Sequence, residues 1–302
     1  MTPTPLERAP EPIAGGRDVY LKREDAHELG AFKWRGALPT IEAYRARGAR
    51  SVVTASTGNH GAAVAWSCRR VGLSAVVYAP EGASRAKLAL IVAQGAEIRL
   101  IGRDLDAAKD EGVRFARAEG LPFFEDGIEP TQYDGYAKVG EEIVGQLGRS
   151  PSAVIVPVGN GALICGIGQA LQNRTPPAVL IGVAAKEAPV MALSYREKRV
   201  VGSDRMGTFA DGLAVRVAIP AAVERVNRLA DRLLLVSERD MAQAIRVLAD
   251  AGIRAEGAAA AAIASLPQLP PFPGPVVCLV TGRNIDEALW RRAVETPESF
   301  PD

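Results

Sequence analysis

Length, composition and charge place this chain among ordinary globular proteins. Its 302 residues are 48% hydrophobic and 24% charged, which allows a sizeable core and excludes a fibrous or disordered chain. The 36 basic and 35 acidic residues give a net charge of +1, so we expect a small-molecule partner and neither nucleic acid nor a membrane. Because the start resembles no leader and no apolar run reaches the roughly 20 residues of a membrane span, we predict a cytoplasmic location.

Short runs of β-branched and apolar residues recur along the chain and predict strands buried on both faces. They are SVVTAS (51–56), SAVVYAP (74–80), AEIRLIG (96–102), AVIVPVG (153–159), AVLIGVAA (178–185) and VVCLVTG (276–282). Between them, residues 60–72, 83–96 and 237–252 carry apolar residues every three or four positions and end near a glycine, as helices do. This alternation predicts an α/β fold with parallel sheets flanked by helices.

The strand and helix units from 52 to 133 predict a small domain. The chain on either side, 1–51 and 134–302, can form a second sheet. We therefore expect two lobes, with the smaller lobe inserted in the larger. A cleft between two lobes is a usual place for a cofactor.

A polar turn follows the first of these strands. It contains Ser56, Thr57, Asn59 and His60 and leads into a helix. Hydroxyls, an amide and free backbone N–H groups at a helix start can receive a carboxylate. The same residue types are also favoured as a plain N-cap. From these residues alone, both interpretations stay open.

A second turn, rich in glycine, follows the strand at 153–159. It reads Gly159, Asn160, Gly161 and Ala162 and leads into another helix. Glycines let backbone N–H groups approach a phosphate, whose charge the helix dipole also stabilises. A dinucleotide site would require a different glycine spacing and an acidic residue about 20 positions further on. The turn predicts a phosphate cradle rather than an NAD site, with a plain tight turn as the alternative.

Lys33 and Thr281 are further candidates. Thr281 ends the last predicted strand, where ligand contacts are frequent in open α/β sheets. Lys33 stands between Phe32 and Trp34. A lysine in apolar surroundings has a lowered pKa and can form a Schiff base, whereas an aromatic neighbour that only covers the stem of a solvated lysine is the simpler interpretation. The lysine, the phosphate cradle, the carboxylate receptor and a hydroxyl are together what pyridoxal phosphate and an amino acid require.

Taken in order, the motifs resemble a known family over nearly the whole chain. LKREDAHELGAFKWRGA (21–37), ASTGNHG (55–61), TFADGLAV (208–215) and AEGAAA (255–260) are similar to segments of the pyridoxal-phosphate enzymes of fold type II, within the threonine/serine dehydratase and serine racemase group. The resemblance implies a two-lobed α/β fold and pyridoxal 5′-phosphate as cofactor. It also implies an amino-acid substrate, and we expect a homodimer.

The resemblance also implies a role for each candidate residue. Lys33 falls on the Schiff-base position and is the catalytic residue. The implied cofactor-binding residues are Phe32, Lys33, Asn59, Gly159, Asn160, Gly161, Ala162, Glu256 and Thr281. The implied substrate-binding residues, which hold the carboxylate, are Ser56, Thr57, Asn59 and His60.

The chain departs from the group's pattern at several positions. Asn160 interrupts what is usually a run of glycines, and we expect its side chain to contact the phosphate or tighten the cleft. Arg283 is charged where a small residue is common, and its role is open. Lys186 stands where cation-binding relatives carry a glutamate, so we predict that Lys186 replaces the ion and pairs with a carboxylate. The alternative is that Glu187 takes the glutamate's place through a one-residue shift.

The expected activity is a lyase reaction of amino-acid metabolism. It is the β-elimination of a 3-hydroxy amino acid, as in threonine dehydratase and serine dehydratase, to a 2-oxo acid and ammonia. Racemisation with Thr57 as the second acid or base is an alternative. Ammonia-lyase or β-replacement chemistry on another amino acid and a non-enzymatic amino-acid sensor are also open. The pocket for the substrate's Cβ would be formed by Tyr133, Asp134, Gly135 and residues 208–212. These residues do not indicate which 3-hydroxy amino acid is preferred.

Overall fold

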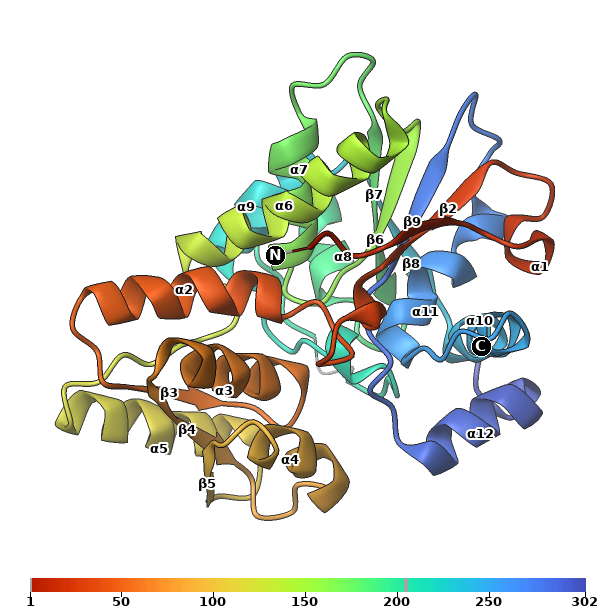
Figure 1. The fold of residues 1–302 in the computed structure, drawn as a ribbon. Helices are drawn as coiled ribbons and strands as arrows, with labels where there is room; N and C mark the ends of the chain where they lie inside the picture. The colour runs from red at the N-terminus through yellow and green to blue at the C-terminus, as the bar shows by residue number, and fades with distance from the viewer. Residues whose placement is uncertain (1, 204–205) are drawn as a thin grey trace. The chain divides into compact units, whose positions relative to one another are not determined.

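The computed structural model describes residues 2–203 and 206–302, which divide into two compact units. The smaller unit is Lys33–Gly135, and the larger unit joins the chain up to Phe32 with Tyr136–Asp302 (Figure 1). The smaller unit is therefore inserted in the larger. Among the described residues, no helix combines the length and apolar character that crossing a bilayer demands.

The smaller unit begins earlier in the chain than the expected boundary at residue 52. The difference comes from α2 (Trp34–Ala46), which packs on α3 (Asn59–Val71). The Trp34 and Trp66 rings meet edge to face with centroids 6.3 Å apart. Aromatic pairs of this kind bury much apolar area, so α2 belongs to the smaller unit.

The larger unit contains a six-stranded sheet in the order β1-β2-β9-β6-β7-β8. Every pairing is parallel except that of β1 with β2. The strands are β1 (Leu6–Arg8), β2 (Val19–Arg23), β6 (Ala153–Pro157), β7 (Val179–Ala185), β8 (Arg232–Val236) and β9 (Val276–Val280). The central strands β6 and β9 are buried throughout, as the continuous apolar runs predicted.

Helices surround this sheet. They are α1 (Glu11–Ala14), α6 (Pro130–Leu147), α7 (Ala162–Leu171), α8 (Val190–Glu197), α9 (Pro220–Leu229), α10 (Glu238–Asp250), α11 (Gly257–Ala264) and α12 (Glu287–Glu295). Helix α6 begins in the smaller unit and continues in the larger. The short 3-10 turns are η1 (Glu24–Ala26), η2 (Asp211–Leu213), η3 (Leu266–Gln268) and η4 (Pro297–Ser299).

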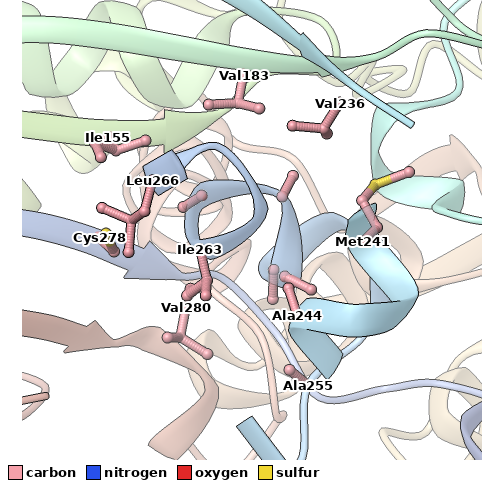
Figure 2. Close-up of a cluster of buried hydrophobic side chains, with 14 of the residues drawn as sticks. Ile155, Val183, Val236, Met241, Ala244, Ala255, Ile263, Leu266, Cys278 and Val280 are labelled. Carbon is pink, nitrogen blue, oxygen red and sulfur yellow. The ribbon is translucent and has the colours of Figure 1, made fainter. Parts of the chain in front are cut away.

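Helix α11 lies in the core of the larger unit. Its sequence GAAAAAIA is apolar on every side, and Gly257–Ile263 are all buried. Figure 2 shows Ile263 of this helix with Ile155 and Val183 of the sheet and Met241 of α10 in one cluster. Because alanine side chains are small, the helix can approach the sheet and α10 closely. This packing fixes the start of α11, at Gly257, near the ends of the strands.

A buried ion pair ties the N-terminal segment to α6. The Lys22 side chain is 0% exposed, and its Nζ donates to Glu142 Oε2 at 2.6 Å, Gln146 Oε1 at 2.9 Å and the Thr4 carbonyl at 2.8 Å. Three acceptors match the three N–H bonds of an ammonium. The pair therefore satisfies a charge that would otherwise be costly to bury.

The smaller unit is built on a three-stranded parallel sheet, β3-β4-β5. Its remaining elements are β3 (Ser51–Ala55), β4 (Ser74–Ala79), α4 (Arg85–Val92), β5 (Glu97–Leu100) and α5 (Leu105–Ala118). After α5 the chain runs beside β3, where Val53 N donates to Pro122 O at 3.0 Å and Phe124 N donates to Val53 O at 2.7 Å. This pairing brings residues 125–127 to the carboxyl end of β3.

Candidate active site

The end of β9 holds the segment that precedes Lys33. Phe32 N donates to Thr281 O at 3.0 Å, and Arg283 N donates to Gly30 O at 2.8 Å. Thr281 is buried, and the Phe32 ring packs on Tyr136 with centroids 5.3 Å apart. Two predicted site residues, Phe32 and Thr281, are therefore brought together by backbone hydrogen bonds, and Lys33 follows Phe32 directly.

Glu256 joins the same place from α11. Its backbone N–H donates to Gly282 O at 3.0 Å. A Cβ added at Gly282 would lie 2.5 Å from Glu256 Oε1, so the Glu256 carboxylate occupies the space over this glycine. A side chain at residue 282 would displace that carboxylate. The glycine next to Thr281 thus leaves room for the carboxylate in this position.

Arg283 and Asn284 brace the loop before Phe32. Arg283 Nη1 donates to Asp25 O at 2.6 Å, and Asn284 Nδ2 donates to Leu29 O at 2.8 Å. Gly30 in this loop has φ +65°, a conformation that favours glycine. The open question of Arg283 thus receives a structural answer: its charge satisfies backbone carbonyls of the loop that leads to Lys33.

The glycine-rich turn has the features of an anion cradle. Gly161 has φ +87° and is the N-cap of α7, and a Cβ added at Gly159 would come within 3.0 Å of the Gly212 carbonyl oxygen. Asn160 Oδ1 accepts a hydrogen bond from Ala162 N at 3.0 Å. The Asn160 side chain therefore stabilises the turn itself, while its expected roles in contacting the phosphate or tightening the cleft stay predictions. The turn places glycine backbone at a helix start, as a phosphate site requires.

Glu238 holds the TFADGLAV segment (208–215), and it was not identified from the sequence. Glu238 is 2% exposed, and its Oε2 accepts from Thr208 Oγ1 at 3.1 Å and from Phe209 N at 2.8 Å. Burial raises the pKa of this carboxyl, against the two hydrogen bonds. Gly212 of the segment lies against Ala258 of α11 as well as beside Gly159. The segment therefore links the glycine-rich turn to the helix that begins after Glu256. A charged residue at the first position of a helix gave no signal beyond that of an ordinary helix start.

In the smaller unit, Lys33 lies in a cluster of charged groups. Its Nζ donates to Asp126 Oδ2, and Asp126 Oδ1 lies 3.6 Å from His60 Nδ1. The Lys33 side chain is 17% exposed and that of Asp126 is 24% exposed. Lys33 is therefore mostly buried as expected, but its surroundings include a carboxylate and are not purely apolar.

The charges in this cluster shift two pKa values. Burial raises the pKa of the Asp126 carboxyl, but the charge of Lys33 and the hydrogen bonds from Lys33 and Gln132 outweigh burial and hold that pKa well below its usual range. Burial lowers the pKa of the His60 imidazole, and the Lys33 charge adds to this effect while Asp126 opposes it. Asp126 is therefore ionised and His60 is neutral near pH 7.

Gln132 orients Asp126. Its Nε2 donates to Asp126 Oδ1 at 2.9 Å, and its Oε1 accepts from Gly127 N at 2.7 Å. Tyr133 OH donates to Gly127 O at 2.7 Å, so this predicted pocket residue supports the loop. Asp134, on the same helix, is exposed. Sequence alone could not point to Asp126, because its neighbours are distant in the chain.

The polar turn after β3 lies in the same unit. Gly58, not a side chain, is the N-cap of α3, and its N–H donates to Ser56 Oγ at 3.1 Å. The plain N-cap interpretation therefore does not account for the hydroxyl and amide groups here. The helix begins at Asn59 and carries His60 in its first turn, where backbone N–H groups favour an anion. A role for Thr57 and Asn59 in binding a carboxylate stays a prediction.

Among residues 2–203 and 206–302, no carboxylate pairs with the Lys186 side chain, although such a partner was predicted. Lys186 follows β7 and is exposed, and its backbone N–H donates to Val236 O at 2.9 Å. Over that same part of the chain, no three His, Cys, Asp or Glu side chains gather as metal ligands do. Lys186 as the replacement of a cation stays a prediction.

Comparisons with known proteins fit this geometry. The family model described as pyridoxal-phosphate dependent enzyme matches residues 1–282. L-threonine ammonia-lyase of Geobacter sulfurreducens is 33% identical over 275 residues, which are 90% of this chain and 68% of that protein. The enzyme of the same name from Thermotoga maritima is 34% identical over 288 residues, with 93% and 71% covered.

Solved structures agree with the sequence comparisons. The processed form of threonine deaminase isoform 2 from Solanum lycopersicum superposes with a TM-score of 0.91 at 29% identity, covering 97% of this chain and 88% of that one. The T.th. threonine deaminase superposes with a TM-score of 0.86 at 26% identity, covering 94% and 93%. The chain therefore belongs to the family of pyridoxal-phosphate dependent enzymes, with the fold type II architecture.

Proposed function

We propose that this chain is a lyase that catalyses β-elimination on a 3-hydroxy amino acid such as threonine or serine, with release of a 2-oxo acid and ammonia. The relatives named L-threonine ammonia-lyase match 90% and 93% of the chain. The observation that carries the proposal is the position of Lys33, directly after a segment bound to the end of β9 and beside Asp126 and His60.

The residues present fit pyridoxal 5′-phosphate, the family's cofactor. The glycine-rich turn at the start of α7 would hold the phosphate, since Gly161 caps this helix in a conformation that favours glycine, and backbone N–H groups and the helix dipole favour an anion there. Thr281 offers a neutral hydroxyl for the ring nitrogen, and Phe32, Asn59 and Glu256 complete the set. When bound, the cofactor withdraws electrons from the substrate's Cα and so makes the Cα proton acidic.

The protein's own groups would then perform three tasks. Lys33 holds the cofactor and, once released, removes the Cα proton. Ser56, Thr57 and the start of α3 bind the substrate carboxylate and fix the orientation of Cα. His60, neutral near pH 7, is fixed in the first turn of α3 by its Nε2, which lies 3.1 Å from Thr54 Oγ1 and 3.3 Å from the Phe124 carbonyl oxygen.

The replacement Lys33→Ala tests this proposal. We expect the purified variant to lack the yellow absorption of the bound cofactor and to release no 2-oxo acid from threonine or serine. Lys138→Ala is the matched control, because Lys138 is exposed on α6 and pairs with the surface residue Glu141. A Lys33→Ala protein with full activity would refute the assignment. Chiral analysis of the remaining serine separates racemisation from elimination.

The homodimer and the cytoplasmic location stay predictions. A homodimer would elute at twice the mass of 31.9 kDa in size-exclusion chromatography with light scattering.

A further inference from the structure

Residues 297–302 pack against the segment that lies beside the glycine-rich turn. Phe300 of this 297–302 segment is 3% exposed, and its ring meets the Phe209 ring with centroids 4.8 Å apart and planes tilted by 55°. Phe209 belongs to the TFADGLAV segment, which is distant in the chain. An aromatic pair of this kind contributes more than its buried area alone. The two segments are therefore joined through two rings of the larger unit.

The first turn of α10 holds the backbone of both segments. Glu238 Oε2 accepts from Phe209 N at 2.8 Å. The next residue, Arg239, donates from Nε to the Phe300 carbonyl oxygen at 3.0 Å and from its backbone N–H to Pro301 O at 2.9 Å. Two consecutive residues of one helix thus fix the backbone at each ring. The ring pair is therefore set by hydrogen bonds of the main chain as well as by packing.

Helix α12 holds the 297–302 segment through Arg292. Its Nε donates to Ser299 Oγ at 2.9 Å, and its Nη2 donates to Ser299 O at 2.8 Å. The same guanidinium lies over the Phe300 ring, 4.3 Å from the centroid. A cation over the face of an aromatic ring is attracted by the ring's electrons. The Phe300 ring is therefore held in place by α12 in addition to α10.

Phe209 has a second neighbour in the core. A Cβ added at Gly257 would lie 2.6 Å from Phe209 Cε2, so this ring lies directly against the start of α11. Helix α11 is buried along Gly257–Ile263 and packs on the sheet, so it resists displacement. The Phe209 ring therefore contacts both the 297–302 segment and the central helix of the larger unit.

The backbone just beyond Phe209 lies against the glycine-rich turn. The Gly212 carbonyl oxygen is so close to Gly159 that a Cβ there would come within 3.0 Å of it. Gly212 lies in a tight turn in which Leu213 N donates to Ala210 O at 2.8 Å. Because this turn follows Phe209 directly, a shift of Phe209 also shifts Gly212. The position of Phe209 therefore bears on the shape of the glycine-rich turn.

We propose that Phe300 is a positioning residue for the cofactor's phosphate. Through the ring of Phe209 it holds Gly212 against Gly159 and so keeps the glycine-rich turn in its anion-binding shape. This inference rests on the proposed function, because it concerns the cofactor that the elimination requires. It assigns a role to a segment that carries none of the motifs found in the sequence.

The test compares two compounds that differ only in the phosphate. Spectrophotometric titration of the cofactor-free protein gives dissociation constants for pyridoxal 5′-phosphate and for pyridoxal. In Phe300→Ala we expect pyridoxal phosphate to bind about 2- to 10-fold more weakly, the range that an aromatic pair contributes. Pyridoxal should bind as in wild type, because it has no phosphate for the turn to hold. Wild-type affinity for pyridoxal phosphate, or an equal loss for both compounds, overturns the proposal.

Phe272→Ala is the matched control. Phe272 packs on the same core cluster, but it precedes β9 and so lies at the amino end of this strand, whereas the glycine-rich turn follows the carboxyl end of the parallel strand β6. This variant should lose stability and keep both affinities. Phe300→Leu keeps most of the apolar volume and should fold even if Phe300→Ala does not. We expect it to bind pyridoxal phosphate about twofold more weakly than wild type, and wild-type affinity in Phe300→Leu would also overturn the proposal.

A double-mutant cycle tests whether Phe300 acts through Phe209. In the background of Phe209→Ala, the further change Phe300→Ala should alter the affinity for pyridoxal phosphate by less than about twofold, because the shared contact is already lost. Losses that multiply would overturn the proposal. Binding is measured without substrate, so a protein that shows these affinities but eliminates no amino acid would refute the proposed function and keep this inference. A wild type that binds no pyridoxal phosphate would overturn both.

Discussion

The glycine-rich turn gives a prediction whose magnitude can be worked from the structure. In Gly159→Ala the added Cβ would come within 3.0 Å of the Gly212 carbonyl oxygen, a separation that Cβ atoms essentially never show. The next neighbours are also backbone, the Gly212 carbonyl carbon at 3.5 Å and Leu213 Cα at 3.6 Å. No rotamer change can relieve such a clash, so one of the two chain segments must move.

Movement of either segment is resisted. The 208–213 segment is held by Glu238 through Thr208 and Phe209, and the glycine-rich turn is continuous with the buried strand β6. Overpacking at such a site destabilises the folded protein by about 1–3 kcal/mol. Alanine has less conformational freedom than glycine in the unfolded chain, and this offsets about 0.4–1 kcal/mol of the destabilisation. We expect Gly159→Ala to lower the free energy of unfolding by about 1–2 kcal/mol.

The assay has two arms. Chemical denaturation of the cofactor-free protein gives the change in stability, and a spectrophotometric titration with pyridoxal phosphate gives the change in affinity for the cofactor. Gly145→Ala is the control, because Gly145 lies in α6 with open space around its Cβ position. This variant should be more stable by about 0.5–1 kcal/mol, as expected for alanine in an exposed helix. A Gly159→Ala protein with wild-type stability and wild-type cofactor affinity would refute the assignment of this turn as a cradle.

Two further predictions concern buried charges. In Glu142→Gln the Lys22 ammonium keeps its hydrogen-bond acceptors but loses the charge of the Glu142 carboxylate. We expect urea denaturation to show that the free energy of unfolding falls by about 3 kcal/mol. A fall of less than about 1 kcal/mol would contradict the role of the buried ion pair. Because burial lowers the pKa of His60, its ring signals in an NMR titration should move little between about pH 6 and 8. Below about pH 6.5 this histidine takes up a proton in the unfolded chain but not in the folded protein. The free energy of unfolding should therefore fall on acidification by up to about 1.4 kcal/mol per pH unit. A titration midpoint of His60 at or above about pH 6.5 would contradict this prediction.

The most deeply buried strands could be predicted from their own residues, and β5 was also predicted although both its end residues are exposed. β6 and β9 are apolar at every position because they lie in the middle of the sheet, and their runs were recognisable. β1 has exposed positions and gave no such run, whereas the apolar residues 233–236 of β8 were not recognised. Helix α11 has no apolar period either, because it is buried on every side.

Some residues of the candidate site could also be predicted from the sequence, and others could not. Lys33, the polar turn and the glycine-rich turn could be found because each is a local pattern with its own chemistry. Asp126 could not be found, because its position beside Lys33 depends on the pairing of residues 122–124 with β3. Glu238 was missed for a similar reason, since its partners Thr208 and Phe209 are 30 and 29 residues away in the chain.

The orientation of Asp126 does not depend on Lys33 alone. The ion pair between the two side chains is partly exposed, and such pairs contribute little to folding. Moreover, the amine of Lys33 is the group that the family's cofactor requires. Because Gln132 Nε2 donates to the other carboxylate oxygen, Asp126 Oδ1, and Gln132 Oε1 accepts from Gly127 N, the carboxylate keeps its orientation whether or not the Lys33 amine is bonded to the cofactor.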